Sequence, residues 1–330
     1  MGAGVLILGQ GLAGTVLAWA CERAGLEFRI ADPGHAGAAT TAAAGILNPI
    51  TGRRLVPARR FAELRAGARE MFRGLEAELG VPLWREVRVR RFFADERERR
   101  TWAERSARGE FGPWAGAAEA DGFWIEGAAR VDLPALLAAA RARWRAQGRL
   151  EERAMTVAEA LQATDGAVVD CRGAAAAGDA VWAAVPAEFS RGEMLELAVA
   201  ELAPDVVLNR RHWVLPVGDG AAWVGATHEP GEREAAPTAA GRAALEASAR
   251  ELLGARPWTV TGHRAGVRVN LPDKQPVAGW HPTERRLGWL GGLGARGASW
   301  APWLAEQWVR HLREGAAFAA ETSTARWAKR

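Results

Sequence analysis

The segment VLILGQGLAG, residues 5–14, most constrains how this chain folds. Its apolar start, Val5–Leu8, predicts a buried parallel strand, and the apolar stretch Leu12–Ala24 predicts a helix. A second strand is expected over Glu27–Ala31. The chain therefore opens with a compact β-α-β unit whose first turn is rich in glycine.

The glycines of that turn have the spacing G-x-G-x-x-G, with Gly9, Gly11 and Gly14 in the three positions. In a dinucleotide site the first glycine permits a tight turn, the second admits the pyrophosphate, and the third lets the helix pack on the strand. Such a site also places an acid at the end of the second strand for the ribose hydroxyls, and Asp32 stands there. The pattern predicts a dinucleotide cradle and leaves open whether NAD or FAD binds.

Two further glycine-bearing segments favour a flavin. TTAAAGILNP, residues 40–49, has the small residues that backbone packed against a large flat ligand requires. GGLGARGASWAP, residues 291–302, places a glycine-rich turn at the start of a helix, where N–H groups and the helix dipole stabilise negative charge on a reduced flavin. A nicotinamide site needs neither segment.

The composition indicates a globular protein large enough for two domains. The 330 residues include 49% hydrophobic residues and carry a net charge of only +4, with acidic residues interleaved among the arginines, so no concentrated nucleic-acid footprint is predicted. Cys21 and Cys171 are too few for a disulfide framework and predict a reduced, cytoplasmic location. The sequence predicts no membrane span and no metal site, and its lack of tyrosine excludes any mechanism that needs a phenol.

The pattern changes along the rest of the chain. The apolar spacing predicts a helix over Phe61–Leu79 and a half-exposed strand over Trp84–Phe93. Residues 205–227 are expected to form two strands turned at Gly218-Asp219-Gly220, and residues 237–253 a helix. Segments typical of nucleotide-binding folds thus occur at the start, middle and end, with antiparallel segments between them, which predicts two interleaved domains.

These motifs resemble those of the FAD-dependent D-amino-acid oxidase superfamily of amine oxidases, which includes glycine oxidase and the flavin domain of the bifunctional tRNA wobble-uridine modification enzyme. The resemblance covers nearly the whole chain and also includes SRGEMLEL, WVLPVGDGAAWVGATHEPG and GVRVNLPDKQPVAG. It implies an α/β fold in which a Rossmann-like FAD-binding domain is interleaved with an antiparallel-sheet substrate domain. The expected FAD-binding segments are 1–80, 127–185 and 262–330, and the expected substrate-domain segments are 81–126 and 186–261.

The resemblance also implies which residues bind FAD. Asp32 is expected at the adenosine ribose, and the backbone of Val157 at the adenine. The remaining expected contacts, from the pyrophosphate to the flavin ring, are Gly9, Gly11, Leu12, Ala13, Gly14, Thr40, Thr41, Ala44, Gly45, Ile46, Gly292, Gly294, Arg296, Gly297 and Ala298.

Three residues are candidates for the chemistry. Arg268, in the G-x-R motif, matches the family's carboxylate-binding arginine, whose planar fork pairs with a carboxylate at two points. Arg296 is expected at the flavin edge or the substrate entrance, with a structural salt bridge as the alternative. Trp213 stands where glycine oxidase has a tyrosine, so its indole either donates a hydrogen bond or packs in the core.

The resulting hypothesis is an FAD-dependent oxidase or dehydrogenase that converts a small amino acid or an N-substituted glycine to an imine by hydride transfer to the flavin. Electrons would then pass to oxygen or to another acceptor such as a quinone. One alternative is oxidation of the carboxymethylaminomethyl group of tRNA wobble uridine. The other is a protein that binds FAD without turning over an amine.

Overall fold

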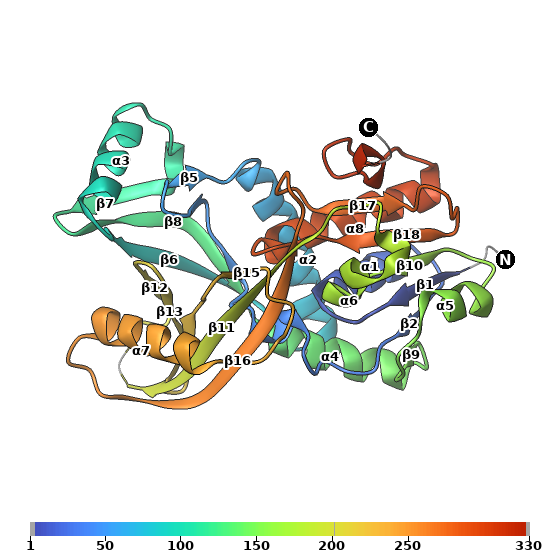
Figure 1. Cartoon of the computed structure of the whole chain (residues 1–330), viewed down its shortest axis with the longest axis horizontal. Coiled ribbons are helices and arrows are strands. Elements are labelled where there is room, and N and C mark those ends of the chain that lie inside the picture. Colours follow the sequence, from blue (N-terminus) through green and yellow to red (C-terminus); the bar gives the residue numbers. More distant parts are fainter. Residues whose placement is uncertain (1–3, 201, 328–330) are drawn as a thin grey trace.

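A computed structural model describes residues 4–200 and 202–327. Figure 1 shows two parts side by side, each built on one large sheet, with both termini in the same part. The part with the termini holds a six-stranded sheet in which every strand is parallel except β17. In spatial order its strands are β17 (Val277–Trp280), β18 (Leu287–Gly291), β10 (Val168–Asp170), β1 (Val5–Leu8), β2 (Phe28–Ala31) and β9 (Leu150–Glu151).

Helices cover both faces of this sheet. One face packs against α1, α4 and α8 in a core that also includes α2, and the other face packs against α5 and α6. The helix bounds in this part are α1 (Leu12–Arg23), α2 (Phe61–Leu79), α4 (Leu133–Ala146), α5 (Val157–Ala163), α6 (Ala174–Gly178) and α8 (Gly297–Glu314), and the short 3-10 turns are η1 (Ala39–Ala42), η3 (Ala180–Trp182) and η4 (Thr324–Trp327).

The other part is organised by a ten-stranded sheet, in which the β6 and β12 pair is parallel and the remaining pairs are antiparallel. Its main order is β15 (Glu229–Pro230), β11 (Glu188–Val199), β14 (Ala221–Gly225), β13 (Trp213–Gly218), β12 (Val206–Asn209), β6 (Trp84–Phe92), β8 (Gly122–Val131) and β3 (Ile46–Leu47). β16 (Trp258–Asn270) pairs with β11, and β7 (Ala115–Glu119) with β8.

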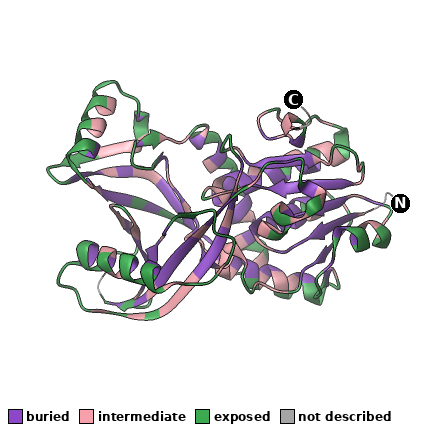
Figure 2. Cartoon of the chain, viewed as in Figure 1, coloured by how far each residue is buried: buried purple, intermediate pink, exposed green. Residues whose placement is uncertain are grey.

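Three helical segments and a small hairpin complete this part. They are α3 (Glu96–Ala107), η2 (Gly112–Trp114), α7 (Ala239–Leu253) and the β4–β5 hairpin (Ile50–Thr51 and Val56–Pro57). Figure 2 shows buried strands in both sheets beside largely exposed outer helices. In α3, for example, Glu98 is the only residue classed as buried. No helix of the described ranges 4–200 and 202–327 is long and apolar enough to cross a membrane.

The structure confirms the predicted fold class and most of the predicted elements. The helix over Phe61–Leu79 has the expected bounds and ends at Gly80, whose φ of 69° favours glycine. The turn at Gly218–Gly220 joins β13 to β14 as expected. The prediction of two strands for residues 205–227 missed a third strand, β12, which precedes β13.

Three strands of the ten-stranded sheet, β3, β8 and β16, lie wholly or partly in segments that were expected to form the FAD-binding domain. The boundary at residue 262 falls inside β16, which continues to Asn270 and pairs with β11 along its whole length. β3 and β8 also belong to the ten-stranded sheet, although residues 46–47 and 127–131 lie in segments assigned to the FAD-binding domain. The long strand β16 therefore belongs to the ten-stranded sheet from Trp258 to Asn270.

The first turn of α1 packs directly on the end of β1. Gly9 has a φ of 93°, a conformation that side chains rarely adopt, and its carbonyl oxygen lies where a Cβ atom on Gly14 would be. Gly14 is therefore a packing residue between helix and strand. Within α2, by contrast, Gly67 has open space around its Cα and is exposed.

We predict opposite effects for alanine at these two helical glycines. Gly14→Ala forces Cβ against a main-chain oxygen and lowers the free energy of unfolding by about 2 kcal/mol or more. Gly67→Ala meets no atom and raises it by about 0.5–1 kcal/mol, because alanine loses less backbone entropy than glycine. Chemical denaturation of the two variants checks this. A Gly14→Ala protein as stable as the wild type would contradict the packing of α1 on β1.

Candidate active site

A cavity of about 680 Å³ lies where the two sheets meet. At one end it opens over the carboxyl ends of the parallel strands β1, β2, β10 and β18, through Gly9, Asp32, Arg172 and Gly291. This is the position in which open parallel sheets bind ligands. At the other end the cavity is lined by residues of the ten-stranded sheet, including Trp213 and Arg268.

Two helices begin at this cavity. Gly11, Leu12 and Ala13 of the α1 start line it, and so do Gly297, Ala298 and Ser299 of the α8 start. Neither helix has a side-chain cap or an acidic residue in its first turn. The N–H groups of a helix start and the helix dipole favour a bound anion. The site thus has the features that a dinucleotide pyrophosphate requires.

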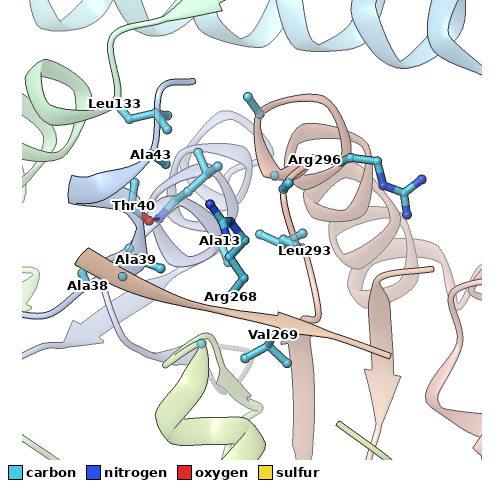
Figure 3. Close-up of a pocket in the computed structure, with 18 of the residues that line it drawn as sticks. Ala13, Ala38, Ala39, Thr40, Ala43, Leu133, Arg268, Val269, Leu293 and Arg296 are labelled. Atoms are coloured by element: carbon cyan, nitrogen blue, oxygen red, sulfur yellow. Dashed lines mark hydrogen bonds between the residues drawn. The ribbon is translucent and has the colours of Figure 1, made fainter. Parts of the chain in front are cut away.

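The hydroxyl of Thr40 fixes the η1 turn to the start of α1. Its Oγ1 accepts a hydrogen bond from the N–H of Leu12 at 3.1 Å, and a Cβ atom on Gly11 would lie 3.4 Å from the same oxygen. The loop with Thr40 and the glycine turn of β1 and α1 therefore form one continuous wall of the cavity. Figure 3 shows Thr40 and Ala13 among the residues that line the cavity.

Asp32 is held at the end of β2 by a set of hydrogen bonds. Its carboxylate accepts the main-chain N–H of Gln10 at 2.7 Å and that of Gly34 at 2.8 Å. The guanidinium of Arg141 also donates to it, at 2.7 Å. The residue is 6% exposed and lines the cavity, so its orientation is set before a ligand binds. Such a carboxylate suits the ribose hydroxyls of a dinucleotide.

The guanidinium of Arg268 enters the cavity from β16 (Figure 3). It donates one hydrogen bond, from Nη1 to the carbonyl oxygen of Thr227 at 3.1 Å. Within the described residues no acidic side chain forms an ion pair with it, and burial lowers its pKa from the usual value. A half-buried cation without a counter-ion is partly desolvated, so this position favours a negatively charged ligand.

The two other candidates for the chemistry are placed differently. Arg296 lines the cavity, but its guanidinium points away from Arg268 (Figure 3) and donates to the carbonyl oxygen of Lys274. It also lies over the ring of Trp300, at 5.6 Å from the ring centroid. Trp213 lines the cavity from β13, with its ring against Gly225, where a Cβ atom would lie 2.7 Å from the indole. Trp213 is half-buried at this wall of the cavity.

The cavity brings together most of the residues that the sequence predicted for the cofactor. The predicted residues that line it are Gly9, Gly11, Leu12, Ala13, Asp32, Thr40, Ala44, Gly45, Ile46, Gly292, Gly294, Arg296, Gly297 and Ala298.

Three predicted cofactor residues lie outside the lining. Gly14 packs against Gly9, and the hydroxyl of Thr41 donates to the carbonyl oxygen of Ala38 at 2.8 Å. Val157 begins α5, where the capping box of Thr156 and Glu159 turns the chain into the helix and the Val157 side chain into the core.

Sequence reasoning missed several residues of the site. Ala154 and Met155 line the cavity just before α5, and the T-x-x-E signal of the capping box could have placed them there. Asn48 and Asn209 bring two amides to the lining from β-strand ends. Gly192 of β11 also lines the cavity. A Cβ atom at this position would overlap the guanidinium of Arg268. The described residues contain no cluster of three or more His, Cys, Asp or Glu suited to a metal ion.

The amino-acid sequence matches one protein family over most of its length. The profile of the family described as "DAO: FAD dependent oxidoreductase" matches residues 4–310. Among curated proteins, the tRNA 5-methylaminomethyl-2-thiouridine biosynthesis bifunctional protein MnmC of Maricaulis maris is 32% identical over 330 residues, 96% of this chain and 53% of that protein. Glycine oxidase of Pseudomonas putida is 37% identical over 111 residues, 32% of this chain and 29% of that protein. The chain thus spans about half or less of the curated relatives that it matches.

Solved structures with the same fold cover nearly the whole chain. Iminodiacetate oxidase from Chelativorans sp. BNC1 has a TM-score of 0.76 at 20% identity and covers 97% of this chain and 99% of its own. Glycine oxidase from Geobacillus kaustophilus has a TM-score of 0.73 at 21% identity, with 96% of each chain covered. At these identities the likeness establishes the fold.

The lining predicts that FAD binds without a covalent bond to the protein. Among the described lining residues there is no His, and the one Cys, Cys171, lies at the phosphate end beside Gly9. Burial raises the pKa of the Cys171 thiol well above its usual value, so the nucleophilic thiolate is scarce. Acid precipitation of the purified protein should leave all the flavin in the supernatant, for the wild type and for Cys171→Ser alike. A yellow pellet from the wild type would contradict this.

Proposed function

Because the chain belongs to the family of FAD-dependent oxidoreductases, its cofactor is FAD, and we propose that it oxidises the C–N bond of a small amino acid or an N-substituted glycine to an imine. When bound, FAD accepts the hydride from the substrate carbon. Arg268 binds the substrate carboxylate and so fixes which carbon faces the cofactor. The remaining walls exclude water and set the size of the substrate.

One observation carries this proposal: the half-buried side chain of Arg268 lines the cavity and pairs with no acidic side chain of the described residues. An arginine has five N–H donors in a planar fork, which matches the two oxygens of a carboxylate. Arg268 uses one hydrogen bond on the carbonyl of Thr227. The other donors and the full charge remain for a substrate anion.

The charges of the cavity also bear on the amine. Asp32 is the one acidic residue among the described residues of the lining, and it is held at the adenosine end of the site by Gln10 and Arg141. No acidic side chain is therefore in place to pair with a substrate ammonium beside Arg268. We infer that the substrate reacts with its amine uncharged, which fits hydride loss from the adjacent carbon.

The substrates after which two structural neighbours are named are consistent with this class. Iminodiacetate and glycine both carry a carboxymethyl group on nitrogen. Trp213, Asn48 and Asn209 also line the cavity, and under this proposal they contact a substituent on that nitrogen. The electrons then pass to oxygen or to a quinone, and the rate at which each reoxidises the reduced enzyme decides between them.

A second candidate function is supported by the similarity to MnmC over 96% of this chain. Under this proposal the substrate is the carboxymethylaminomethyl group of tRNA wobble uridine, which is itself an N-substituted glycine. Nucleoside analysis of tRNA from a strain that lacks the gene tests it. Accumulation of that modification intermediate supports the tRNA substrate, and unchanged nucleosides exclude it.

We predict that an anaerobic screen with glycine, sarcosine, iminodiacetate and D-amino acids finds an amine that bleaches the flavin of the wild type. Arg268→Ala should raise the KM for that amine by about 100-fold or more, because it removes the proposed partly desolvated charge pair with the carboxylate. Stopped-flow absorption of the flavin measures the bleaching and its dependence on amine concentration.

The matched control is Arg88→Ala, which removes an exposed arginine that pairs with Glu126 on the ten-stranded sheet. This variant should behave as the wild type, since exposed ion pairs contribute about 0–1 kcal/mol. The proposal fails if no amine bleaches the wild-type flavin. In that case we would conclude that the protein binds FAD without turning over an amine. The proposal also fails if Arg268→Ala keeps the wild-type KM.

A further inference from the structure

We propose that Thr227 and Gly192 form a socket that fixes the guanidinium of Arg268, with Thr227 as the positioning residue and Gly192 as the residue that clears the space. This inference rests on the proposed function, because it concerns the same carboxylate-binding group. It goes further by naming what determines the direction in which that group points.

The first element of the socket is the hydrogen bond from Nη1 of Arg268 to the carbonyl oxygen of Thr227, at 3.1 Å. It is the one hydrogen bond that Arg268 makes to the described residues. An arginine side chain has several rotatable bonds, and holding it in one geometry costs side-chain entropy. A fixed carbonyl at one corner of the fork reduces the entropy that is lost when a carboxylate binds at the opposite edge.

The carbonyl of Thr227 is itself held in place by Glu193. The N–H of Thr227 donates to the carbonyl oxygen of Glu193 at 3.2 Å, and the hydroxyl of Thr227 accepts the N–H of Glu193 at 2.9 Å. Thr227 is 5% exposed, so these hydrogen bonds do not compete with bulk water. Its hydroxyl thus ties the segment after β14 to β11.

Glu193 extends the support to α7. Its side chain is fully buried, and the carboxylate accepts the N–H of Thr238 at 2.9 Å and the hydroxyl of Thr238 at 2.8 Å. Thr238 is the N-cap of α7. The carboxylate also faces Nε2 of His263 on β16 at 2.9 Å. Strand β11 is therefore fixed to α7 and to β16 at the residue that holds Thr227.

Gly192 provides the space for the guanidinium. A Cβ atom at this position would overlap both terminal nitrogens and the central carbon of Arg268. Gly192 pairs across the sheet with Gly266 of β16, two residues before Arg268. A Cβ atom on Gly266 would lie 2.9 Å from Cα of Ala39 in η1. Gly192 thus leaves room for the Arg268 side chain over β11, and Gly266 lets the η1 turn approach β16.

The test uses acetate as a carboxylate probe, titrated against the oxidised, FAD-loaded protein and followed by the flavin absorption spectrum. Thr227→Val removes the hydroxyl at nearly constant volume and leaves the buried N–H of Glu193 unpaired, so acetate should bind about tenfold more weakly. Thr227→Ser keeps the hydroxyl and should bind acetate within about twofold of the wild type. Gly192→Ala should lose acetate binding to the same extent as Arg268→Ala.

A second readout separates positioning from general damage. In Thr227→Val the KM for the amine found in the screen should rise with the acetate Kd, while kcat changes less and the FAD content stays that of the wild type. Thr227→Val with wild-type acetate affinity, beside an Arg268→Ala variant that loses it, overturns the socket and leaves the proposed function standing. Loss of FAD together with acetate affinity in both Thr227→Val and Gly192→Ala also overturns it. Wild-type acetate affinity in Arg268→Ala overturns the proposed function itself.

Discussion

The guanidinium of Arg268 determines what the rest of this structure can do. Its charge is partly withdrawn from water at the wall of a cavity, and one main-chain carbonyl is its hydrogen-bond partner within the described residues. Burial of an unpaired charge costs free energy that the fold must supply from elsewhere. Under the proposed function, a substrate carboxylate beside Trp213 and Gly192 would balance this charge. The position of the charge follows from the packing of β11 and β16.

The location of that charge depends on how the two sheets are joined. The six-stranded sheet presents its carboxyl edge, with Gly9, Asp32 and the start of α1, to one end of the cavity. The long strand β16 belongs to the other sheet and carries Arg268 to the same cavity. Glycines make this approach possible, since Gly14 admits the carbonyl of Gly9 and Gly266 admits Ala39. A cofactor that spans the cavity would lie between an anion-binding helix start and a fixed cation.

Much of the cofactor end could be predicted from sequence because its signals are local. A local pattern predicts this geometry without reference to distant residues: Gly9, Gly11 and Gly14 lie between a strand and a helix, and Asp32 follows the next strand. Gly192 and Thr227 carry no such signal, since their roles arise only when β11, β16 and the segment after β14 are packed together. The extent of β16 carries no local signal either, because only pairing with β11 shows that the strand passes the expected boundary at residue 262 and continues to Asn270.

The most direct measurement is a crystal structure of the FAD-loaded protein with a bound carboxylate substrate or inhibitor. The account predicts the pyrophosphate at the start of α1, a ribose hydroxyl at Asp32, and the carboxylate of the ligand within hydrogen-bonding distance of the Arg268 guanidinium. That guanidinium should still donate to the carbonyl of Thr227, as it does at 3.1 Å here. A ligand carboxylate bound elsewhere, with Arg268 paired to a protein acid or turned to solvent, would contradict it.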